Sequence, residues 1–301
     1  MRSQFDVIVV GGSFAGLSAA MQLARARRRV LVVDGRKPRN RFAAHSHGFF
    51  GQDGKSPAEI IGEATAQLAQ YPTVDIVTAE AETARQLDGR FVITLTDRRM
   101  FDADRIVLAT GVRDELPSLP GLDERWGASV LHCPYCHGYE VADKKLGVLA
   151  TNALSIHQAL LIPDWGPTTW FTQGIVEATR EEALLLEARK VRIERTPVVE
   201  MLGNAPDTTG LRLSDGRVVA IDAVFVSPRT HMASTVAEQL GCEFDEGPTG
   251  PTIRANEFKQ TSVRGVFAAG DAATAWTNAT FASAAGVTAG VAAHRSLISG
   301  L

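Results

Sequence analysis

Cysteine is scarce in this chain, with three residues among 301, which excludes a fold held together by a framework of disulfides. No apolar run reaches the roughly 18 residues that a membrane-spanning helix needs, so we expect no membrane as partner. The N-terminus enters the short apolar run Phe5–Val10 without the longer stretch and small-residue cleavage site of a signal peptide. Together these absences predict a cytoplasmic protein.

An excess of charge of either sign is also missing. The chain has 31 Lys and Arg against 34 Asp and Glu, which gives a net charge of -3. This balance offers no electrostatic attraction for nucleic acid or for an anionic membrane surface. Aromatic residues make up only 7% of the chain, whereas glycine occurs 27 times. The combination is typical of an α/β protein with many tight turns, and the length predicts about two domains.

The N-terminal region has the order strand, glycine turn, helix, strand. We predict a buried parallel strand at Phe5–Val10, a helix at Leu17–Arg25 and a second strand at Arg29–Val33. The turn between the first strand and the helix consists of Gly11, Gly12, Ser13, Phe14, Ala15 and Gly16. Glycine allows a tight turn there and lets backbone N–H groups at the helix N-terminus approach a pyrophosphate. Asp34, followed by Gly35, stands where an acidic side chain holds a ribose hydroxyl.

Each of these signals has a weaker interpretation when it stands alone. A glycine turn is often only a tight turn, and Asp34 by itself would be a helix cap or a turn residue. Ser13 also occupies the position where the strict fingerprint has its second glycine. Their combination in one βαβ unit nevertheless predicts a dinucleotide site.

The remaining pattern predicts two α/β units, the second inserted into the first. Arg36–Lys55 is expected to be an irregular surface excursion, and Pro117 and Pro120 suggest a domain crossing. We therefore predict an α/β fold of two Rossmann-like domains, with residues 115–228 inserted between residues 1–114 and 229–301. Further predicted elements are the helix Pro57–Gln70, two strand-like runs in Asp75–Leu95, the strands Arg105–Ala109, Lys145–Ala150, Thr168–Thr172 and Val266–Ala269, a strand pair or long strand at Val218–Val226, and the helices Ser155–Leu161, Glu181–Ala188 and Ala282–Ser299.

Three motifs in this order resemble those of the two-dinucleotide-binding-domain flavoproteins: the glycine turn, Leu108-Ala109-Thr110-Gly111 and Phe267-Ala268-Ala269-Gly270-Asp271. The resemblance spans nearly the whole chain and implies FAD as the cofactor. It places Ala109, Thr110 and Gly111 beside FAD. Gly270 would permit close backbone approach, and the carboxylate of Asp271 would accept hydrogen bonds from the ribityl chain. Arg39 and Asn40 would line the same site, although a solvated loop is the alternative for these two residues.

The cysteine motif is Cys133-Pro134-Tyr135-Cys136, in which two thiols are close enough to form a small-loop disulfide. His137 follows directly and could act as acid or base near neutral pH. Half of a zinc site is the alternative, but there is no second cysteine pair, so we expect no metal. Cys242 is expected to be an inert small side chain.

The position of this motif resembles that of the redox-active cysteines in low-molecular-weight thioredoxin reductases. The resemblance implies that Cys136 faces the flavin, that Cys133 meets the substrate, and that His137 replaces an acidic proton donor. It also implies a homodimer. The inserted unit departs from those reductases, because no glycine follows Gly147–Ala150 and no arginine follows the next strand. We therefore predict that the inserted unit does not bind NADPH.

A subgroup of the family shares these departures. Three parts of the chain resemble the dithiol oxidases that close disulfides in gliotoxin- and holomycin-type metabolites. They are Cys133–Glu140, Pro38-Arg39-Asn40 with Ser46-His47-Gly48, and Gly147–Ala150 with the segment 157–161. The resemblance implies electron flow from a small-molecule or peptide dithiol through the cysteine pair and FAD to O2, with hydrogen peroxide as product. Two alternatives remain open. One is a reductase of thioredoxin or a related disulfide, fed by NADPH or a donor such as ferredoxin; the other is a non-catalytic flavin-binding regulatory protein.

Overall fold

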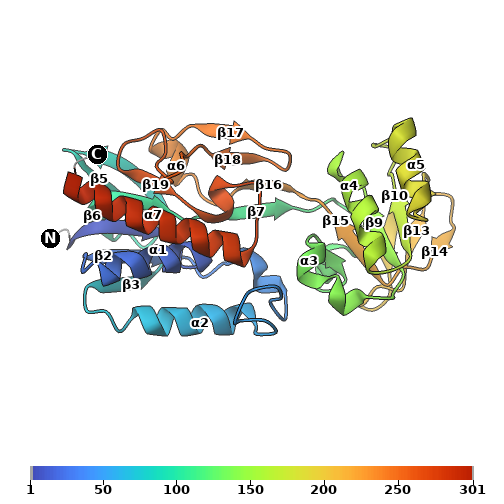
Figure 1. The fold of residues 1–301 in the computed structure, drawn as a ribbon, viewed down its shortest axis with the longest axis horizontal. Helices are drawn as coiled ribbons and strands as arrows, with labels where there is room; N and C mark the ends of the chain where they lie inside the picture. Colours follow the sequence, from blue (N-terminus) through green and yellow to red (C-terminus); the bar gives the residue numbers. More distant parts are fainter. Residues whose placement is uncertain (1–2, 300–301) are drawn as a thin grey trace. The chain divides into compact units, whose positions relative to one another are not determined.

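The structure, a computed structural model, describes residues 3–299 and consists of two compact units (Figure 1). The first unit comprises the described residues up to Arg41, Pro57–Arg113 and those from Thr230 onward. The second comprises Phe42–Ser56 and Asp114–Arg229. Most of the excursion predicted at Arg36–Lys55 is therefore packed with the inserted unit, although the sequence pattern had grouped it with the first.

A seven-stranded sheet forms the centre of the first unit, with the order β3-β2-β1-β6-β5-β4, while β19 also pairs with β6. The strands β1, β2, β3, β6 and β19 are parallel, whereas β4 and β5 form an antiparallel extension. The strands of this sheet are β1 (Ser3–Val10), β2 (Val30–Asp34), β3 (Val74–Thr78), β4 (Ala81–Leu87), β5 (Arg90–Leu95), β6 (Met100–Leu108) and β19 (Val266–Ala268). The helical segments of this part of the chain are α1 (Phe14–Arg25), η1 (Arg39–Phe42), α2 (Pro57–Leu68), α6 (Val236–Gln239), η5 (Gly270–Ala273) and α7 (Ala279–Ser299).

The parallel strands are buried on both faces, which explains why their sequences are continuous apolar runs. Val7, Ile8 and Val9 of β1 have no exposed surface, because helices cover one face and β-structure with α6 lies on the other. Helix α7 lies along α1 (Figure 1). Its glycines allow this close approach: a Cβ atom at Gly290 would lie 2.5 Å from the carbonyl oxygen of Ala19.

The second unit contains a five-stranded, fully parallel sheet with the order β11-β10-β9-β15-β8. Its strands are β8 (Val130–Leu131), β9 (Leu146–Leu149), β10 (Thr168–Phe171), β11 (Arg192–Glu194) and β15 (Ala223–Val226). Its helical segments are η2 (Asp123–Arg125), α3 (Pro134–His137), η3 (Tyr139–Val141), α4 (Leu154–Leu161), η4 (Ile162–Asp164) and α5 (Arg180–Ala188). Smaller sheets are formed by β12 (Val198–Leu202), β13 (Gly210–Leu213) and β14 (Val218–Val219), by β7 (Val112–Glu115) with β16 (Arg229–Met232), and by β17 (Phe244–Glu246) with β18 (Pro251–Ile253).

The α/β fold with two Rossmann-like sheets is confirmed, but two details of the strand prediction are corrected. Asp75–Leu95 holds parts of three strands rather than two, because the chain turns twice, after Thr78 and after Leu87. Val218–Val226 holds two strands that belong to different sheets. They are separated at Asp222, whose carboxylate accepts the backbone N–H of Lys145. Within residues 3–299, no helix combines the length and apolarity required to cross a membrane.

Candidate redox and cofactor site

The glycine turn after β1 is closely packed against two other predicted site segments. Gly11 has a φ of 114°, and a Cβ atom there would lie 2.1 Å from the carbonyl oxygen of Ala109. A Cβ atom at Gly12 would lie 2.4 Å from the Cγ of Asp34. The fold thus brings the glycine turn, the Ala109–Gly111 loop and Asp34 together, as the dinucleotide interpretation requires.

The N-terminus of α1 has a local structure that fits an anion. Ser13 occupies the N-cap in an extended conformation, and its side chain makes no capping hydrogen bond. Phe14, Ala15 and Gly16 form the first turn of this 12-residue helix. The partial positive charge at a helix N-terminus favours a phosphate group there. The structure therefore retains the anion-binding geometry even though serine replaces the second glycine of the strict fingerprint.

Residues from the far end of the sequence complete the same region of the first unit. A Cβ atom at Gly270 would lie 2.9 Å from the Cβ of Ala15, so the turn after β19 packs on the start of α1. Asp271 accepts a hydrogen bond of 2.9 Å from Arg39, and both side chains are largely buried. The Oδ1 atom of Asn40 is buried without a hydrogen-bond partner. A buried, unsatisfied acceptor in this position fits a ligand that donates hydrogen bonds.

Two further predicted residues lie at the edge of this group. One carboxylate oxygen of Asp34 accepts the backbone N–H of Arg36 at 2.8 Å, which orients the acid at the end of β2. Gly35 packs beside Glu80. The closely packed glycines, the helix N-terminus without a Ser13 side-chain cap and the unsatisfied Oδ1 of Asn40 together fit a dinucleotide cofactor.

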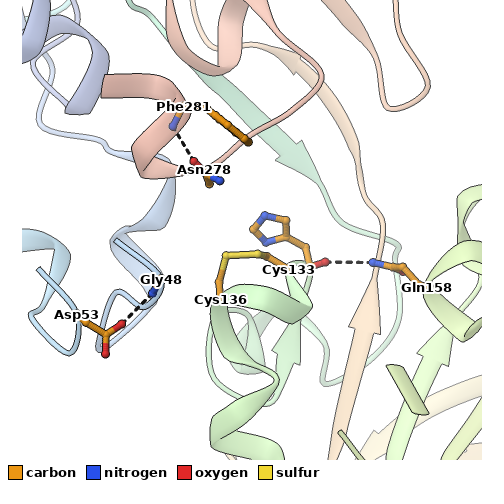
Figure 2. Close-up of a disulfide and its surroundings, with 8 residues drawn as sticks. Gly48, Asp53, Cys133, Cys136, Gln158, Asn278 and Phe281 are labelled. Atoms are coloured by element: carbon orange, nitrogen blue, oxygen red, sulfur yellow. Dashed lines mark hydrogen bonds between the residues drawn. A yellow bond between two sulfur atoms is a disulfide. The ribbon is translucent and has the colours of Figure 1, made fainter. Parts of the chain in front are cut away.

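The cysteine pair lies in the second unit and forms a disulfide (Figure 2). Cys133 is the N-cap of α3, with Pro134 at the first helical position, so the sequence Cys-Pro-Tyr-Cys starts a single helical turn. Gly138 ends that turn against Trp165, where a Cβ atom would lie 2.7 Å from the indole ring. Cys133 and Cys136 are both partly exposed. A disulfide in this position is accessible to an attacking thiolate.

His137 follows the pair, and its surroundings favour the neutral imidazole. Burial lowers the pKa of His137, while the nearby carboxylate of Glu140 acts in the opposite direction and His47 adds to the lowering. A neutral imidazole is a proton acceptor at neutral pH. Glu140 and His47 both occur in motifs of the sequence, but no role for either residue could be predicted from the sequence alone.

The strand that leads into the disulfide is held by a buried glutamine. Gln158 of α4 donates a hydrogen bond of 3.1 Å to the carbonyl oxygen of His132 (Figure 2). The ring of His132 stacks at a tilt on Trp126, with 5.9 Å between the ring centroids. The residue directly before Cys133 is therefore held by a hydrogen bond to its backbone and by a contact of its ring.

The loop after β9 is closed by side chains where a dinucleotide-binding loop would need bare backbone. Asn152 donates through Nδ2 to the carbonyl oxygen of Ser227 at 2.8 Å, and Thr151 donates to the same oxygen. The Oδ1 atom of Asn152 accepts the backbone N–H of Leu154, the first residue of α4. One N–H group at the start of this helix is therefore already used inside the protein.

The end of the next strand is also committed to internal hydrogen bonds. Gln173 follows β10, at the position where a cofactor 2′-phosphate would be recognised. Its side-chain amide accepts the backbone N–H of Val198 at 2.6 Å and donates to the carbonyl oxygen of the same residue.

Cys242, the third cysteine, is buried in the first unit, where burial raises the pKa of its thiol.

Comparison with known proteins gives a consistent result. The sequence profile of the family described as "Pyridine nucleotide-disulphide oxidoreductase" matches residues 5–154 and 175–286. The chain is 32% identical to thioredoxin reductase tcpT of Claviceps purpurea, over 98% of this chain and 95% of that protein. It is also 32% identical to thioredoxin reductase sirT of Leptosphaeria maculans, over 96% and 93% of the two chains. An oxidoreductase from Agrobacterium tumefaciens has a similar crystal structure, with a TM-score of 0.94, 49% identity and coverage of 98% and 99%.

Proposed function

The chain belongs to the pyridine nucleotide-disulphide oxidoreductase family, and we propose that within this family it is a dithiol oxidase. It is a thioredoxin reductase-like oxidoreductase and its cofactor is FAD, as the sequence motifs predicted. In the proposed reaction a small-molecule or peptide dithiol is closed to a disulfide. Bound FAD supplies an acceptor for the two electrons, and O2 takes them up as hydrogen peroxide.

The observation that carries this proposal is the loop after β9. Asn152 and Thr151 fill the space beside Ser227, and Asn152 also takes up the first N–H of α4. A pyrophosphate would have to displace these hydrogen bonds, and none of the loop residues is a glycine. Electrons therefore have no evident route from NADPH, whereas the disulfide of Cys133 and Cys136 is accessible to a substrate dithiol.

The chemistry assigned to the cysteine pair follows from thiol–disulfide exchange. A substrate thiolate attacks Cys133, which forms a mixed disulfide and releases Cys136 as a thiolate. The second substrate thiol then attacks the substrate sulfur of the mixed disulfide and releases Cys133. His137, kept neutral by burial, accepts a proton from the substrate.

We assign FAD binding to the residues that the first unit brings together. The glycine turn and the N-terminus of α1 would hold the pyrophosphate, and Asp34 would hold the ribose. Arg39, Asn40 and Asp271 would contact the cofactor beside the start of α1. The remaining members of the proposed site are Gly35, Ala109, Thr110, Gly111 and Gly270.

The proposal is tested by the colour of the flavin under anaerobic conditions. The purified yellow holoenzyme is mixed with dithiothreitol or, separately, with excess NADPH. Bleaching by dithiothreitol alone, reversed by air with release of one hydrogen peroxide per flavin, is the expected result. Rapid bleaching by NADPH would refute the dithiol oxidase.

A disulfide reductase is the second candidate, and the relatives named thioredoxin reductase favour it. In that case electrons flow from a donor such as NADPH or ferredoxin through FAD to the disulfide, and the partner is thioredoxin or a related protein. Bleaching by such a donor, followed by reduction of an added protein disulfide, would establish this direction. We further propose a homodimer in the cytoplasm, as the family resemblance implies; sedimentation of the holoenzyme tests the dimer.

A further inference from the structure

His47 comes from a distant part of the sequence and contacts Glu140 of η3, the helical turn that follows the cysteine pair. It lies in Phe42–Ser56, which packs with the second unit. Its Nε2 atom is 3.4 Å from a carboxylate oxygen of Glu140, and its Nδ1 atom is 3.6 Å from a carboxylate oxygen of Asp53. Each ring nitrogen of His47 thus has a proton-exchanging neighbour.

These contacts form a line that runs from Glu140, three residues after the half-buried His137, to the solvent at Asp53. Glu140 follows His137 by three residues in a helical stretch, and this spacing places two side chains on the same side. The charge of Glu140 raises the pKa of His137 against the effect of burial. Side-chain exposure is 40% for Glu140, 23% for His47 and 70% for Asp53. The far end of the line is therefore open to water.

The reaction itself requires such an exit. Oxidation of one dithiol releases two protons, one as each substrate thiol becomes the attacking thiolate. The first attack forms the bond to Cys133 and breaks the bond between Cys133 and Cys136; the second forms the substrate disulfide and breaks the mixed disulfide. Two electrons then reside on two cysteine thiolates. His137 is a single base, so it must lose the first proton before it can accept the second.

We propose that Glu140 and His47 relay this proton from His137 to the solvent at Asp53. The inference rests on the proposed thiol chemistry and adds two positioning residues to it. The segment is organised for the task, because Asp53 is itself fixed by the backbone N–H of Gly48 at 2.8 Å (Figure 2). In each turnover the proton moves outward, and His137 returns to its neutral form.

The titratable groups around His47 come from three elements. Glu140 belongs to η3, His137, on which the charge of His47 acts, ends α3, and Asp53 and His45 belong to the same segment as His47. His45 is an internal control. Its Nδ1 atom lies 3.1 Å from the carbonyl oxygen of Gly54 and its ring centroid is 6.3 Å from that of His47, but it has no place in the line.

The experiment uses holoenzyme variants and anaerobic stopped-flow reduction of the flavin by dithiothreitol across pH 5.5–9. We expect His47→Gln and Glu140→Gln to slow reduction by at least about tenfold, a modest share of the effect of a direct acid–base group. In these two variants the acidic limb of the pH–rate profile should move in opposite directions. It should move to lower pH in Glu140→Gln, which removes a charge that raises the pKa of His137, and to higher pH in His47→Gln. In a His47→Ala variant, added imidazole should restore the rate, whereas His45→Gln should resemble the wild type.

Three outcomes would overturn the relay. Unchanged rates and pH profiles in both variants would show that protons leave by another path. If His45→Gln loses as much of the flavin reduction rate as His47→Gln, and if neither the opposite pH shifts nor the rescue by imidazole is seen, His47 has a structural role only. If the wild-type flavin is not reduced by dithiol at all, the proposed function itself fails and the relay with it; reduction of the wild type separates the two cases.

Discussion

A single methyl group added at Gly286 of helix α7 should push this helix away from the start of α1. Gly286 faces α1, and a Cβ atom there would lie 2.1 Å from the backbone carbonyl oxygen of Ala15. Cβ contacts under 3.0 Å essentially never occur, so Gly286→Ala requires a shift of about 1 Å. The obstacle is backbone, and Gly290 holds α7 against Ala19 one turn later. The helix therefore cannot relieve the clash by a rotamer change.

The expected loss of stability follows from two opposing effects. Overpacking of a tight core costs about 1–3 kcal/mol, and a clash with backbone belongs at the upper end of that range. Replacing glycine by alanine inside a helix returns about 1 kcal/mol. We therefore expect Gly286→Ala to lower the free energy of unfolding by about 2 kcal/mol. Because Ala15 belongs to the cofactor turn, FAD should also be released at a lower urea concentration.

Gly62→Ala is the matched control for this variant. Gly62 lies in α2, is exposed, and would place its Cβ atom with nothing within 4 Å. The same chemical change should here stabilise the protein by about 0.5–1 kcal/mol. Urea unfolding followed by circular dichroism and by flavin fluorescence measures both variants. Equal stability of Gly286→Ala and the wild type would refute the packing argument.

Three further predictions concern the cofactor, the disulfide and an ion pair. Gly12→Ala should yield colourless protein, because its methyl group would strike Asp34; retained yellow colour after dialysis would contradict this. Cys136→Ser should uncouple dithiothreitol from the flavin, and reduction at the wild-type rate would remove Cys136 from the pathway. Arg217 donates to Glu194 and lowers the pKa of that buried carboxyl to about 2, well below its usual range. Because the folded pKa is lowered, Arg217→Gln should lower the free energy of unfolding above pH 4.5, and the loss should shrink as the pH falls toward 2. Urea unfolding at pH 7 and at about pH 3.5 compares the two.

The parts of the fold that the sequence predicted depend on local patterns. Phe5–Val10 is apolar throughout because both faces of β1 are buried, and that pattern needs no knowledge of distant residues. Gly11, Gly12 and Asp34 are also readable locally, since a tight turn and an acid at the end of a strand follow from spacing alone. The grouping of these residues with Asp271 came from the family resemblance, and the contact between Arg39 and Asp271 supports it.

The parts that the sequence did not predict depend on contacts between distant segments. Nothing within Phe42–Ser56 indicates that it packs with the inserted unit, because the segment has neither helical nor strand periodicity. The proximity of His47 and Glu140 is invisible for the same reason, as 93 positions separate them. A histidine beside a glycine in a polar loop is the only local signal, and such a pair is common in loops of no chemical importance.

If the inserted unit binds no nucleotide, as we propose, the loop after β9 still holds the start of α4 in place. In a dinucleotide-binding unit, the start of the corresponding helix is stabilised by the phosphates of its ligand. Here Asn152 supplies that stabilisation permanently by accepting the N–H of Leu154. One turn further along this helix, Gln158 donates a hydrogen bond to the carbonyl oxygen of His132, the residue before Cys133. The helix thus supports the disulfide through a hydrogen bond that does not depend on any cofactor, and β8, the strand before the cysteine pair, belongs to the same parallel sheet as β9.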